Sequence, residues 1–599
     1  MSRSVESYAP IGDGRTVALV GVDGRIDWLP VPNLTNDPVF ARLLDEKTGG
    51  CFELTPDLPA SEITVHRRYV PDTNVLETTF ETSRGTIRVT DALVSGVAGR
   101  LPWAELARRV EGVDGEVRVR WRVHPGTSLR TAAPWIDETP HGYVVRSGAT
   151  AFTIVGLDHG AADPDPDGET GPELVGSFVT SGGSRHVIAL AATHEEPLHF
   201  PDPHNVDSGI DRTIDNWRHW SEVFSYEGPY AERMQRNALA LKLLIYSPSG
   251  AIAAAATTSL PENRSGGKNW DYRFAWVRDL AYTAHALVRF GLREETQAAL
   301  SWMLQTIRKH GPELHVMYTL DGELVPAPTR HHVPGWRGIG PVVIGNPAHE
   351  QLQLGVYGDL IAICRTYVDA GNVLDIGTAR MLAGVADRTC DLWRNPDSGM
   401  WELPDERHYI SSKMGCWKAL EDACALADSG AIPGSAVRWR AEQRRIREWI
   451  DKHGWSEERG SYLFYAGGEE LDTSVLLHAP SGFDRGERMS STIDALGDEL
   501  GAGPLLYRYS GMPGEEHTFV ASAFWRVEAL ACVGRHEEAL ELLDELVERS
   551  NDVGIFSEMI DADDGSAWGN TPQALSHLAF LGAVMTIRDV VPPELLRER

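Results

Sequence analysis

The chain lacks the features that mark disulfide scaffolds, zinc ribbons and membrane proteins. It has only six cysteines in 599 residues, none in a Cys-x-x-Cys pair, which disfavours a zinc ribbon or a dithiol redox site. No stretch approaches the roughly 18 consecutive apolar residues that a membrane span needs, and the N-terminus has no apolar signal-peptide core. The sequence therefore predicts a cytoplasmic protein with reduced thiols and no membrane partner.

Positive charge is also in short supply. The chain has 56 Lys and Arg residues against 86 Asp and Glu residues, a formal net charge of −30. Such a field repels phosphate backbones and anionic lipids, so we expect no nucleic-acid partner. No polar low-complexity tract is present, and 599 residues exceed what one hydrophobic core supports, so two or more folded domains are expected.

The first 200 residues carry the alternation typical of strands. Polar and apolar residues alternate over 116–123 and 142–146, and Gly, Pro and Asp turns separate such runs. We expect an antiparallel β-sandwich domain over residues 1–208. Segment 160–172 contains three prolines and three glycines, a composition that predicts a loop with no strand or helix.

From about residue 210 the apolar period changes to three and four residues, as in amphipathic helices. We expect linker helices over 209–250 and a helical catalytic domain over 251–599. About a dozen helices would suit six helical hairpins closed into a barrel, although periodicity alone also allows a solenoid. Beyond the linker, the predicted helices span 280–290, 294–308, 351–369, 375–393, 413–427, 435–453, 490–500, 521–533, 537–550 and 573–590.

Four loop segments combine Trp, Tyr, Asp, Glu and Arg, a mixture that suits sugar rings and hydroxyl groups. They span residues 269–280, 399–408, 506–517 and 554–565. Asp279 in the first segment is either a ligand-binding group or a helix N-terminal residue that interacts with the helix dipole. Arg508 in the third either binds substrate or neutralises the neighbouring Glu515 and Glu516.

Glu402 and Glu558 are candidates for acid and base chemistry. A carboxyl packed against an indole, as Glu402 beside Trp401 suggests, is desolvated and holds its proton, which suits a general acid. Glu558 follows an apolar run and could activate water. Glycoside hydrolysis needs two carboxyl groups, but with 86 acidic residues the sequence spacing does not single out a pair.

Several blocks in the same order resemble glycoside hydrolase family 15, which contains glucoamylases, glucodextranases and bacterial trehalases. The blocks are residues 11–16, 23–29, 40–45, 257–262, 269–279, 345–359 and 569–578. The resemblance covers nearly the whole chain. It implies an N-terminal antiparallel β super-sandwich followed by an (α/α)6 six-hairpin barrel.

The resemblance also implies roles for individual residues. Glu402 falls on the family's general acid and Glu558 on its general base, while Arg278 and Asp279 fall on the pair that grips the terminal glucose. Arg508 falls on an arginine that contacts the same glucose. The remaining expected substrate-binding residues form the walls of the site: Trp276, Trp336, Tyr357 and Trp401.

The implied activity is exo-acting hydrolysis with inversion, which releases β-D-glucose from the non-reducing end of a small α-glucoside. Trehalose or an isomalto- or malto-oligosaccharide is the expected partner, with no metal and no organic cofactor. An inverting site places its two carboxyl groups about 6.5–9.5 Å apart. The alternatives are a catalytically weak sugar-binding or sensing homologue, phosphorolysis on the same barrel, and hydrolysis of an unusual α-glycoside.

Two further expectations concern regions around the site. Residues 335–343 depart from the pattern of many relatives, with Gly335-Trp336 and Pro341-Val-Val, and we expect this stretch near the substrate entrance. His349, His408 and His577 share no metal-type spacing and are interpreted as packing or hydrogen-bonding residues. The sequence leaves the oligomeric state open, a homo-oligomer included.

Overall fold

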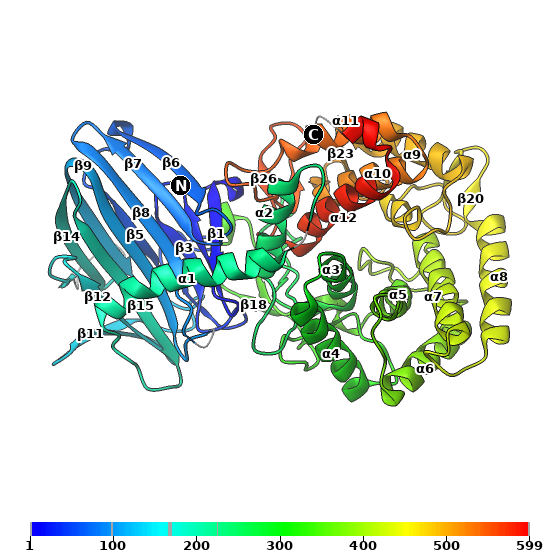
Figure 1. Ribbon diagram of the computed structural model, residues 1–599, viewed down its shortest axis with the longest axis horizontal. Helices are drawn as coiled ribbons and strands as arrows, with labels where there is room; N and C mark the ends of the chain where they lie inside the picture. Colours follow the sequence, from blue (N-terminus) through cyan, green and yellow to red (C-terminus); the bar gives the residue numbers. More distant parts are fainter. Residues whose placement is uncertain (1–2, 98–99, 166–170, 225, 597–599) are drawn as a thin grey trace.

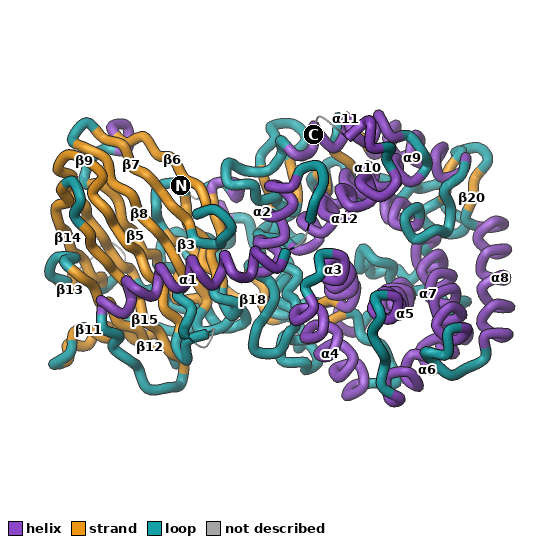
Figure 2. The backbone as a smooth tube through the Cα atoms, viewed as in Figure 1, coloured by secondary structure: helices purple, strands orange, loops and turns teal. Residues whose placement is uncertain are grey.

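The structure is a computed structural model that describes residues 3–97, 100–165, 171–224 and 226–596. Figure 1 shows two parts, a layered sheet structure formed by the N-terminal residues and a ring of helices formed by the rest. Figure 2 shows the same division, with strands gathered at one end and helices at the other. This agrees with the expected antiparallel β domain followed by a helical barrel.

One long strand, β9 (Ala104–His124), holds the β domain together. Its first half pairs with β8 and β15, whereas its second half pairs with β5 and β14, so β9 passes from one layer to the other. Gly112 and Gly115 lie at the change of partner, where a Cβ atom would strike the facing backbone. The strands are β1 (Tyr8–Gly12), β2 (Val17–Gly21), β3 (Ile26–Pro30), β4 (Pro38–Phe40), β5 (Cys51–Pro56), β6 (Ile63–Tyr69), β7 (Leu76–Thr82), β8 (Gly85–Leu93), β9, β10 (Trp135–Thr139), β11 (Gly142–Ser147), β12 (Thr150–Leu157), β13 (Asp163–Asp165), β14 (Glu173–Ser181) and β15 (Arg185–His194).

The predicted absence of a strand in 160–172 is wrong at one point. Residues Asp163–Asp165 form β13, whose one partner within the described part of the chain is β14, so β13 lies at the edge of the sheet there. An edge strand tolerates Pro164 because one side of its backbone needs no ladder hydrogen bond. Residues 166–170 lie outside the described part of the chain.

Two helices connect the domains. Helix α1 (Pro203–Val223) begins at Asp202, whose side chain accepts a hydrogen bond from the His204 backbone amide. It packs on strands of the β domain and extends toward the ring of helices, as Figure 1 shows. Helix α2 (Ala231–Lys242) packs instead on α12 of the ring.

Two concentric layers form the ring. The inner layer is α3 (Val277–Arg289), α5 (Gly355–Asp369), α7 (Ile410–Asp428), the 3-10 helix η5 (Thr473–His478), α10 (Val520–Cys532) and α12 (Ala574–Val590). The outer layer is α4 (Arg293–His310), α6 (Ile376–Leu392), α8 (Ala436–His453), α9 (Glu487–Leu500), α11 (His536–Val547) and α2. Each inner element packs on its inner neighbours, and α12 packs on α3, which closes the barrel.

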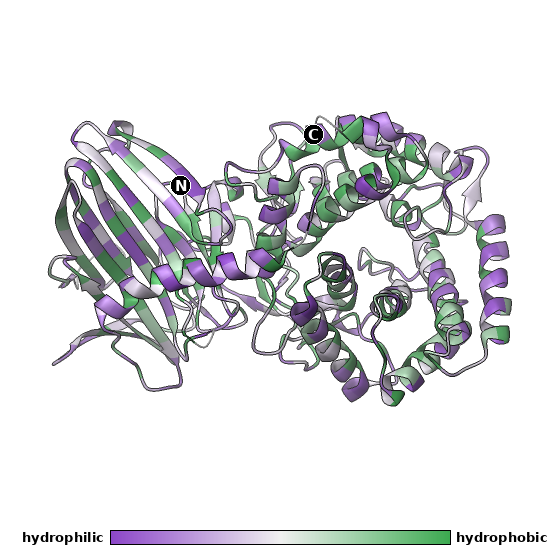
Figure 3. Ribbon diagram, in the orientation of Figure 1, coloured by the Kyte–Doolittle hydropathy of each residue, from purple (hydrophilic) through white to green (hydrophobic). Residues whose placement is uncertain are grey.

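The amphipathic patterns explain the two layers. Outer helix α8 buries Trp439, Ile446 and Ile450 on one stripe and is otherwise largely hydrophilic, as its colouring in Figure 3 shows. Inner helix α12 is buried almost all round from Ala574 to Ile587. A helix that is apolar on every side has to lie inside other helices, whereas a helix with one apolar stripe faces solvent. Among the described residues, no helix combines the length and apolarity that a bilayer crossing requires.

Short strands lie in the loops at one end of the barrel, where the predicted site residues are also found. They are β16 (Ala275–Trp276), β17 (Met317–Tyr318), β18 (Thr329–His331), β19 (Val342–Ile344), β20 (Trp455–Ser456), β21 (Ser461–Tyr462), β22 (Gly501–Ala502), β23 (Leu505–Leu506), β24 (Thr518–Phe519), β25 (Met559–Ile560) and β26 (Ala567–Trp568). Strand β16 pairs with β17, and β24, β25 and β26 form a three-stranded sheet.

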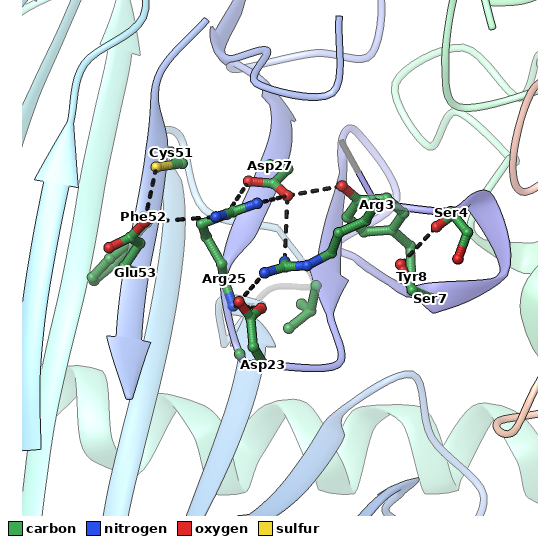
Figure 4. Close-up of polar contacts among 12 residues, drawn as sticks. Arg3, Ser4, Ser7, Tyr8, Asp23, Arg25, Asp27, Cys51, Phe52 and Glu53 are labelled. Carbon is green, nitrogen blue, oxygen red and sulfur yellow. Dashed lines mark hydrogen bonds and ion pairs between the residues drawn. The ribbon is translucent and has the colours of Figure 1, made fainter. Parts of the chain in front are cut away.

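The first residues of the chain link the β domain to these loops. Arg3 and Arg25 both contact Asp27, and the Tyr8 hydroxyl donates to the same carboxylate at 2.8 Å, as Figure 4 shows. In the other direction, the Glu6 carboxylate accepts from the backbone amide of Ala567 at 3.2 Å. The N-terminal segment is therefore tied to the hairpin of β25 and β26 as well as to the sheet.

Candidate active site

A cavity of about 380 Å³ opens at the loop end of the barrel. Its lining comes from segments far apart in the sequence: residues 254–279, 346–351, 400–404, 508–519, 558 and 573–575. Seven of the nine site residues predicted from the sequence line it: Trp276, Arg278, Asp279, Trp401, Glu402, Arg508 and Glu558. The cavity therefore collects both candidate catalytic carboxyl groups.

Glu402 lies in the loop between α6 and α7. Its backbone has a φ of 61°, an uncommon conformation for a residue with a Cβ atom. The indole Nε1 of Trp276 donates to Glu402 Oε1 at 2.7 Å, and Arg278 Nη2 lies 4.0 Å from the same oxygen. Burial is the main cause that raises the pKa of Glu402, while Arg278 and the Trp276 hydrogen bond act in the opposite direction. The indole contact expected for this carboxyl is therefore present, but Trp276 rather than the adjacent Trp401 makes it.

Glu558 sits at the start of a hairpin that explains its surroundings. It immediately precedes β25, and in the β25–β26 register Met559 pairs with Trp568, so the position opposite Glu558 is Gly569. The backbone amide of Asn570 donates to Glu558 Oε2 at 2.8 Å. The side chain is fully buried, and Oε1 accepts no hydrogen bond within the described residues.

Arg508 lies among three carboxylates. Its Nη2 atom donates to Glu262 Oε2 at 3.0 Å and lies 3.8 Å from Glu558 Oε1, and its Nε atom lies 3.4 Å from Glu516 Oε2. The guanidinium also lies 4.7 Å from the centre of the Phe519 ring. Arg508 therefore contacts Glu516, one of the glutamates it was expected to neutralise, and it also lines the cavity, so its substrate-binding role stays a prediction.

Arg278 and Asp279 occupy the first turn of α3. The buried Asp279 carboxylate lies 3.4 Å from Arg278 Nε and also faces the cavity, so its place in the helix does not exclude it from the site. Arg278 Nη1 donates to the backbone carbonyl of Met400 at 3.1 Å, which ties α3 to the loop that carries Glu402. Burial raises the pKa of Asp279, against the effect of Arg278.

Trp276 and Trp401 form aromatic walls, each held by a hydrogen bond from its indole nitrogen. Trp276 donates to Glu402, whereas Trp401 donates to Asp472 Oδ1 at 2.7 Å. The ring of Trp401 lies edge-on to Phe519 with centroids 5.6 Å apart. These contacts fix the planes of both indoles against the cavity.

Two predicted wall residues do not line this cavity. Trp336 is buried in the core, where its Nε1 donates to the Arg3 carbonyl at 2.8 Å and its ring packs edge-on against Trp568. Tyr357 lies on α5 and faces an adjoining cavity beside Arg388, which shares Gln351 with the first cavity. Large aromatic residues look the same in a sequence whether they pack a core or face a ligand, and the position of each ring in the fold decided here.

Residues 335–343 lie behind the cavity lining, and their expected closeness to the substrate entrance stays a prediction. Within the described residues, none of this stretch lines the cavity. Instead, the Val343 carbonyl accepts hydrogen bonds from the hydroxyls of Thr258 and Ser259, and the Gly340 carbonyl accepts from the amide of Gly267. The stretch therefore supports the wall segment 258–269 from behind.

Several lining residues had not been singled out from the sequence. Glu262 is fully buried beside Arg508, and the Tyr272 hydroxyl donates to Glu262 Oε1 at 3.0 Å. Gln351 Nε2 donates to the backbone carbonyl of Glu402 at 3.0 Å, because α5 starts only at Gly355 and leaves Gln351 in the loop. All three lie in sequence blocks that carry the family resemblance, 257–262, 269–279 and 345–359, and membership of such a block was the signal available for them.

The three histidines noted in the sequence make ordinary contacts. His349 Nδ1 lies 2.9 Å from the Asn346 carbonyl and His577 Nδ1 lies 2.6 Å from Asn237 Oδ1, while His408 packs on Trp449. No group of three or more potential metal ligands occurs in the part of the chain that the structure describes.

Comparison with known proteins agrees with this architecture. A family model for glycosyl hydrolases family 15 matches residues 228–585, and a model for the trehalase-like N-terminal domain matches residues 1–147. The chain is 32% identical to a trehalase of Thermoplasma acidophilum, with 94% of this chain and 97% of the relative covered. It is also 32% identical to a trehalase of Mycobacterium tuberculosis, with 97% and 89% covered.

Among solved structures, the chain is similar to a bacterial glucoamylase crystallised with acarbose. The TM-score is 0.68 over 99% of this chain and 97% of that one, at 12% sequence identity. A likeness at that identity establishes the shared fold, a β domain followed by a helical barrel.

Proposed function

The chain belongs to glycosyl hydrolase family 15, and from that premise we propose that it hydrolyses α,α-trehalose with inversion, using Glu402 as general acid and Glu558 as general base. The observation that carries the proposal is that two carboxyl groups in different environments line one cavity. Glu402 accepts a hydrogen bond from the Trp276 indole N–H and lies near Arg278. Glu558 accepts one from the backbone amide of Asn570, and its other oxygen has no hydrogen bond among the described residues.

Burial raises the pKa of Glu402 and also that of Glu558, the latter to about 8, so the direction of the pKa shift does not by itself assign the two roles. Glu402 suits the acid role because the groups around it are placed to stabilise the carboxylate that forms when it gives its proton to the departing oxygen. As the glycosidic bond breaks, the carboxylate that forms is stabilised by the Trp276 N–H at 2.7 Å and by Arg278. Arg278 also fixes the loop of Glu402 through the Met400 carbonyl. The acid and the proposed glucose-binding pair therefore form one unit.

Glu558 suits the base role because its Oε1 atom has no hydrogen-bond partner among the described residues and can accept one from water. The Asn570 amide holds the other oxygen in place. In the proposed step, water loses a proton to Glu558 as its oxygen attacks the anomeric carbon, and Glu402 gives its proton to the leaving oxygen. We expect the two carboxyl groups to stand about 6.5–9.5 Å apart around the sugar.

Trehalose is the proposed substrate because the relatives compared above are trehalases aligned over nearly the full length of this chain. In trehalose both anomeric carbons are α and share one oxygen. Inversion at one of them releases one β-glucose, and the leaving glucose keeps its α configuration. Equal initial amounts of the two anomers are therefore the signature of inversion on this substrate, whereas retention would release only the α anomer.

The test is glucose release from trehalose, isomaltose, maltose, isomaltotriose and dextran by the purified protein, with the anomers followed by proton NMR. We expect rapid release from trehalose and a loss of about 10²–10⁴-fold in kcat for both Glu402→Gln and Glu558→Gln. Glu105→Gln is a matched control, because Glu105 is a buried glutamate of the β domain that accepts one indole hydrogen bond from Trp103.

Each part of the proposal can fail separately. Faster release from isomaltose or maltose than from trehalose would overturn the substrate. Release of α-glucose alone would overturn inversion. Full activity in either catalytic variant would overturn the assigned roles, and sugar binding without any release would favour a binding or sensing homologue.

A further inference from the structure

The carboxylate arrangement around Arg508 contains two acids that the proposed reaction does not use, Glu262 and Glu516. Glu262, Glu516 and Glu558 all contact this guanidinium, and their side chains are 1%, 4% and 0% exposed. Lys268 Nζ lies 2.5 Å from Glu516 Oε1. Glu516 thus has a cation of its own, which leaves Arg508 as the main counter-charge for both Glu262 and Glu558.

Glu262 and Glu558 form a pair of buried carboxyls around Arg508. The groups that face this pair come from four separate segments. Glu262 meets Arg508 and accepts from the hydroxyl of Tyr272, which follows it by ten residues, and Lys268 and Glu516 act on it through space. Glu558 accepts from the Asn570 amide and lies 3.8 Å from Arg508 Nη2, and the charge of Glu262 acts on it through space. Because both carboxylates approach the same Nη2 atom, at 3.0 and 3.8 Å, ionisation of one opposes ionisation of the other.

We propose that Glu262 competes with Glu558 for Arg508 and thereby sets the pH at which the proposed base loses its proton. This inference rests on the role proposed for Glu558. Glu262 is then a positioning residue that acts through the base. Glu262 is protonated at low pH and becomes a negatively charged neighbour of Glu558 at high pH. Glu558 therefore loses its proton at a higher pH than it would if Arg508 were its one charged neighbour.

The electrostatics support this geometry. Burial raises the pKa of both carboxyls, and the negative charge of Glu262 is the next largest cause that raises the pKa of Glu558. Arg508 opposes both effects. The two oxygens share one nitrogen neighbour and are thus at most roughly 7 Å apart, where two charges at an effective dielectric constant of about 20 shift a pKa by about one to two units.

The experiment is the pH profile of kcat/KM on trehalose for the wild type, Glu262→Gln and Glu262→Asp. In the first variant an uncharged amide faces Arg508, so we expect the acid limb to move to lower pH by about one to two units. Glu262→Asp keeps the charge, so its acid limb is expected to stay nearer the wild type even where kcat falls. Glu105→Gln is the control for loss of a buried acid remote from the cavity, and its profile should be unchanged.

An acid limb that stays in place in Glu262→Gln, or that moves to higher pH, would overturn the proposal. So would equal shifts in the Gln and Asp variants, because removal of contacts rather than of charge would then be responsible.

A second readout does not depend on activity. Carboxyls whose pKa is raised by folding bind protons more tightly in the folded state, so their contribution to stability is lost as pH rises from the unfolded pKa through the folded one. Glu262→Gln removes one member of the pair. The Tm of this variant minus the Tm of the wild type should therefore increase as the pH rises from about 5 to about 8. Parallel Tm curves would overturn the coupling even in a protein with no trehalase activity, whereas full activity in Glu558→Gln would overturn the proposed base alone.

Discussion

Gly569 should be intolerant of any side chain because it lies directly opposite Glu558 in the β25–β26 hairpin. Its φ is 79°, and a Cβ atom placed there would lie 2.7 Å from the Glu558 Cβ and closer still to its Oε2. Gly569→Ala must therefore displace the proposed base or open the hairpin, which stretches the 2.8 Å hydrogen bond from the Asn570 amide.

Two effects add in this variant. The left-handed backbone costs about 1–2 kcal/mol in any residue with a Cβ atom, and loss of a hydrogen bond to a charged group costs about 1.5–3 kcal/mol. A catalytic group displaced by about 1 Å costs about 10²-fold in rate. We expect Gly569→Ala to lower kcat on trehalose about 100-fold, with a reduced Tm.

Gly565 offers a matched control in the same hairpin. Its φ is 73°, but nothing lies within 4 Å of the position that an alanine methyl would take, so Gly565→Ala carries the backbone cost without the contact to Glu558. Steady-state hydrolysis and calorimetry of the two variants separate strain from displacement. If Gly569→Ala retains the kcat of Gly565→Ala, the stated geometry of the base is wrong.

Three further predictions test other contacts of the site. Trp276→Phe removes the N–H that stabilises the Glu402 carboxylate, so the pKa of Glu402 should rise and the alkaline limb of the kcat/KM profile should move to higher pH; an unmoved limb would contradict this. Arg508→Gln leaves buried carboxylates without their cation at a cost of about 3–5 kcal/mol, so calorimetry should find a larger loss of Tm at pH 8 than at pH 5, and an equal loss would count against it. Trp336→Phe removes the hydrogen bond to the Arg3 carbonyl and part of a fully buried ring that packs on Trp568, so Tm should fall while KM stays within about twofold, and a large rise in KM would return Trp336 to the substrate wall.

The sequence alone was sufficient for the order of the two domains and for most helices. Period-two alternation over 116–123 predicted the second half of β9, and a three- and four-residue period predicted helices such as α8 and α12. These patterns are local, because one face or stripe of each element must be apolar to be buried. Closure of the barrel needed the structure, since closure depends on which helices touch, as α12 and α3 do.

The site shows the same division. The mixture of aromatic and charged residues in loops pointed to Glu402, Glu558, Arg278 and Asp279, and the family resemblance paired the carboxyls. Their assembly in one cavity depends on the tertiary structure. The three segments that carry them are more than a hundred residues apart in the sequence and meet only when the barrel closes.

Where the sequence misled, burial and partners decided. Trp336 and Tyr357 were expected in the walls of the site, yet Trp336 packs against Trp568 and Tyr357 faces an adjoining cavity. Glu262 stood in a recognised block, but its closeness to Arg508 depends on a contact across 246 positions. Composition and period determine which segments must be buried and in what form, whereas the charge that each carboxyl meets is set by neighbours that only the folded chain brings together.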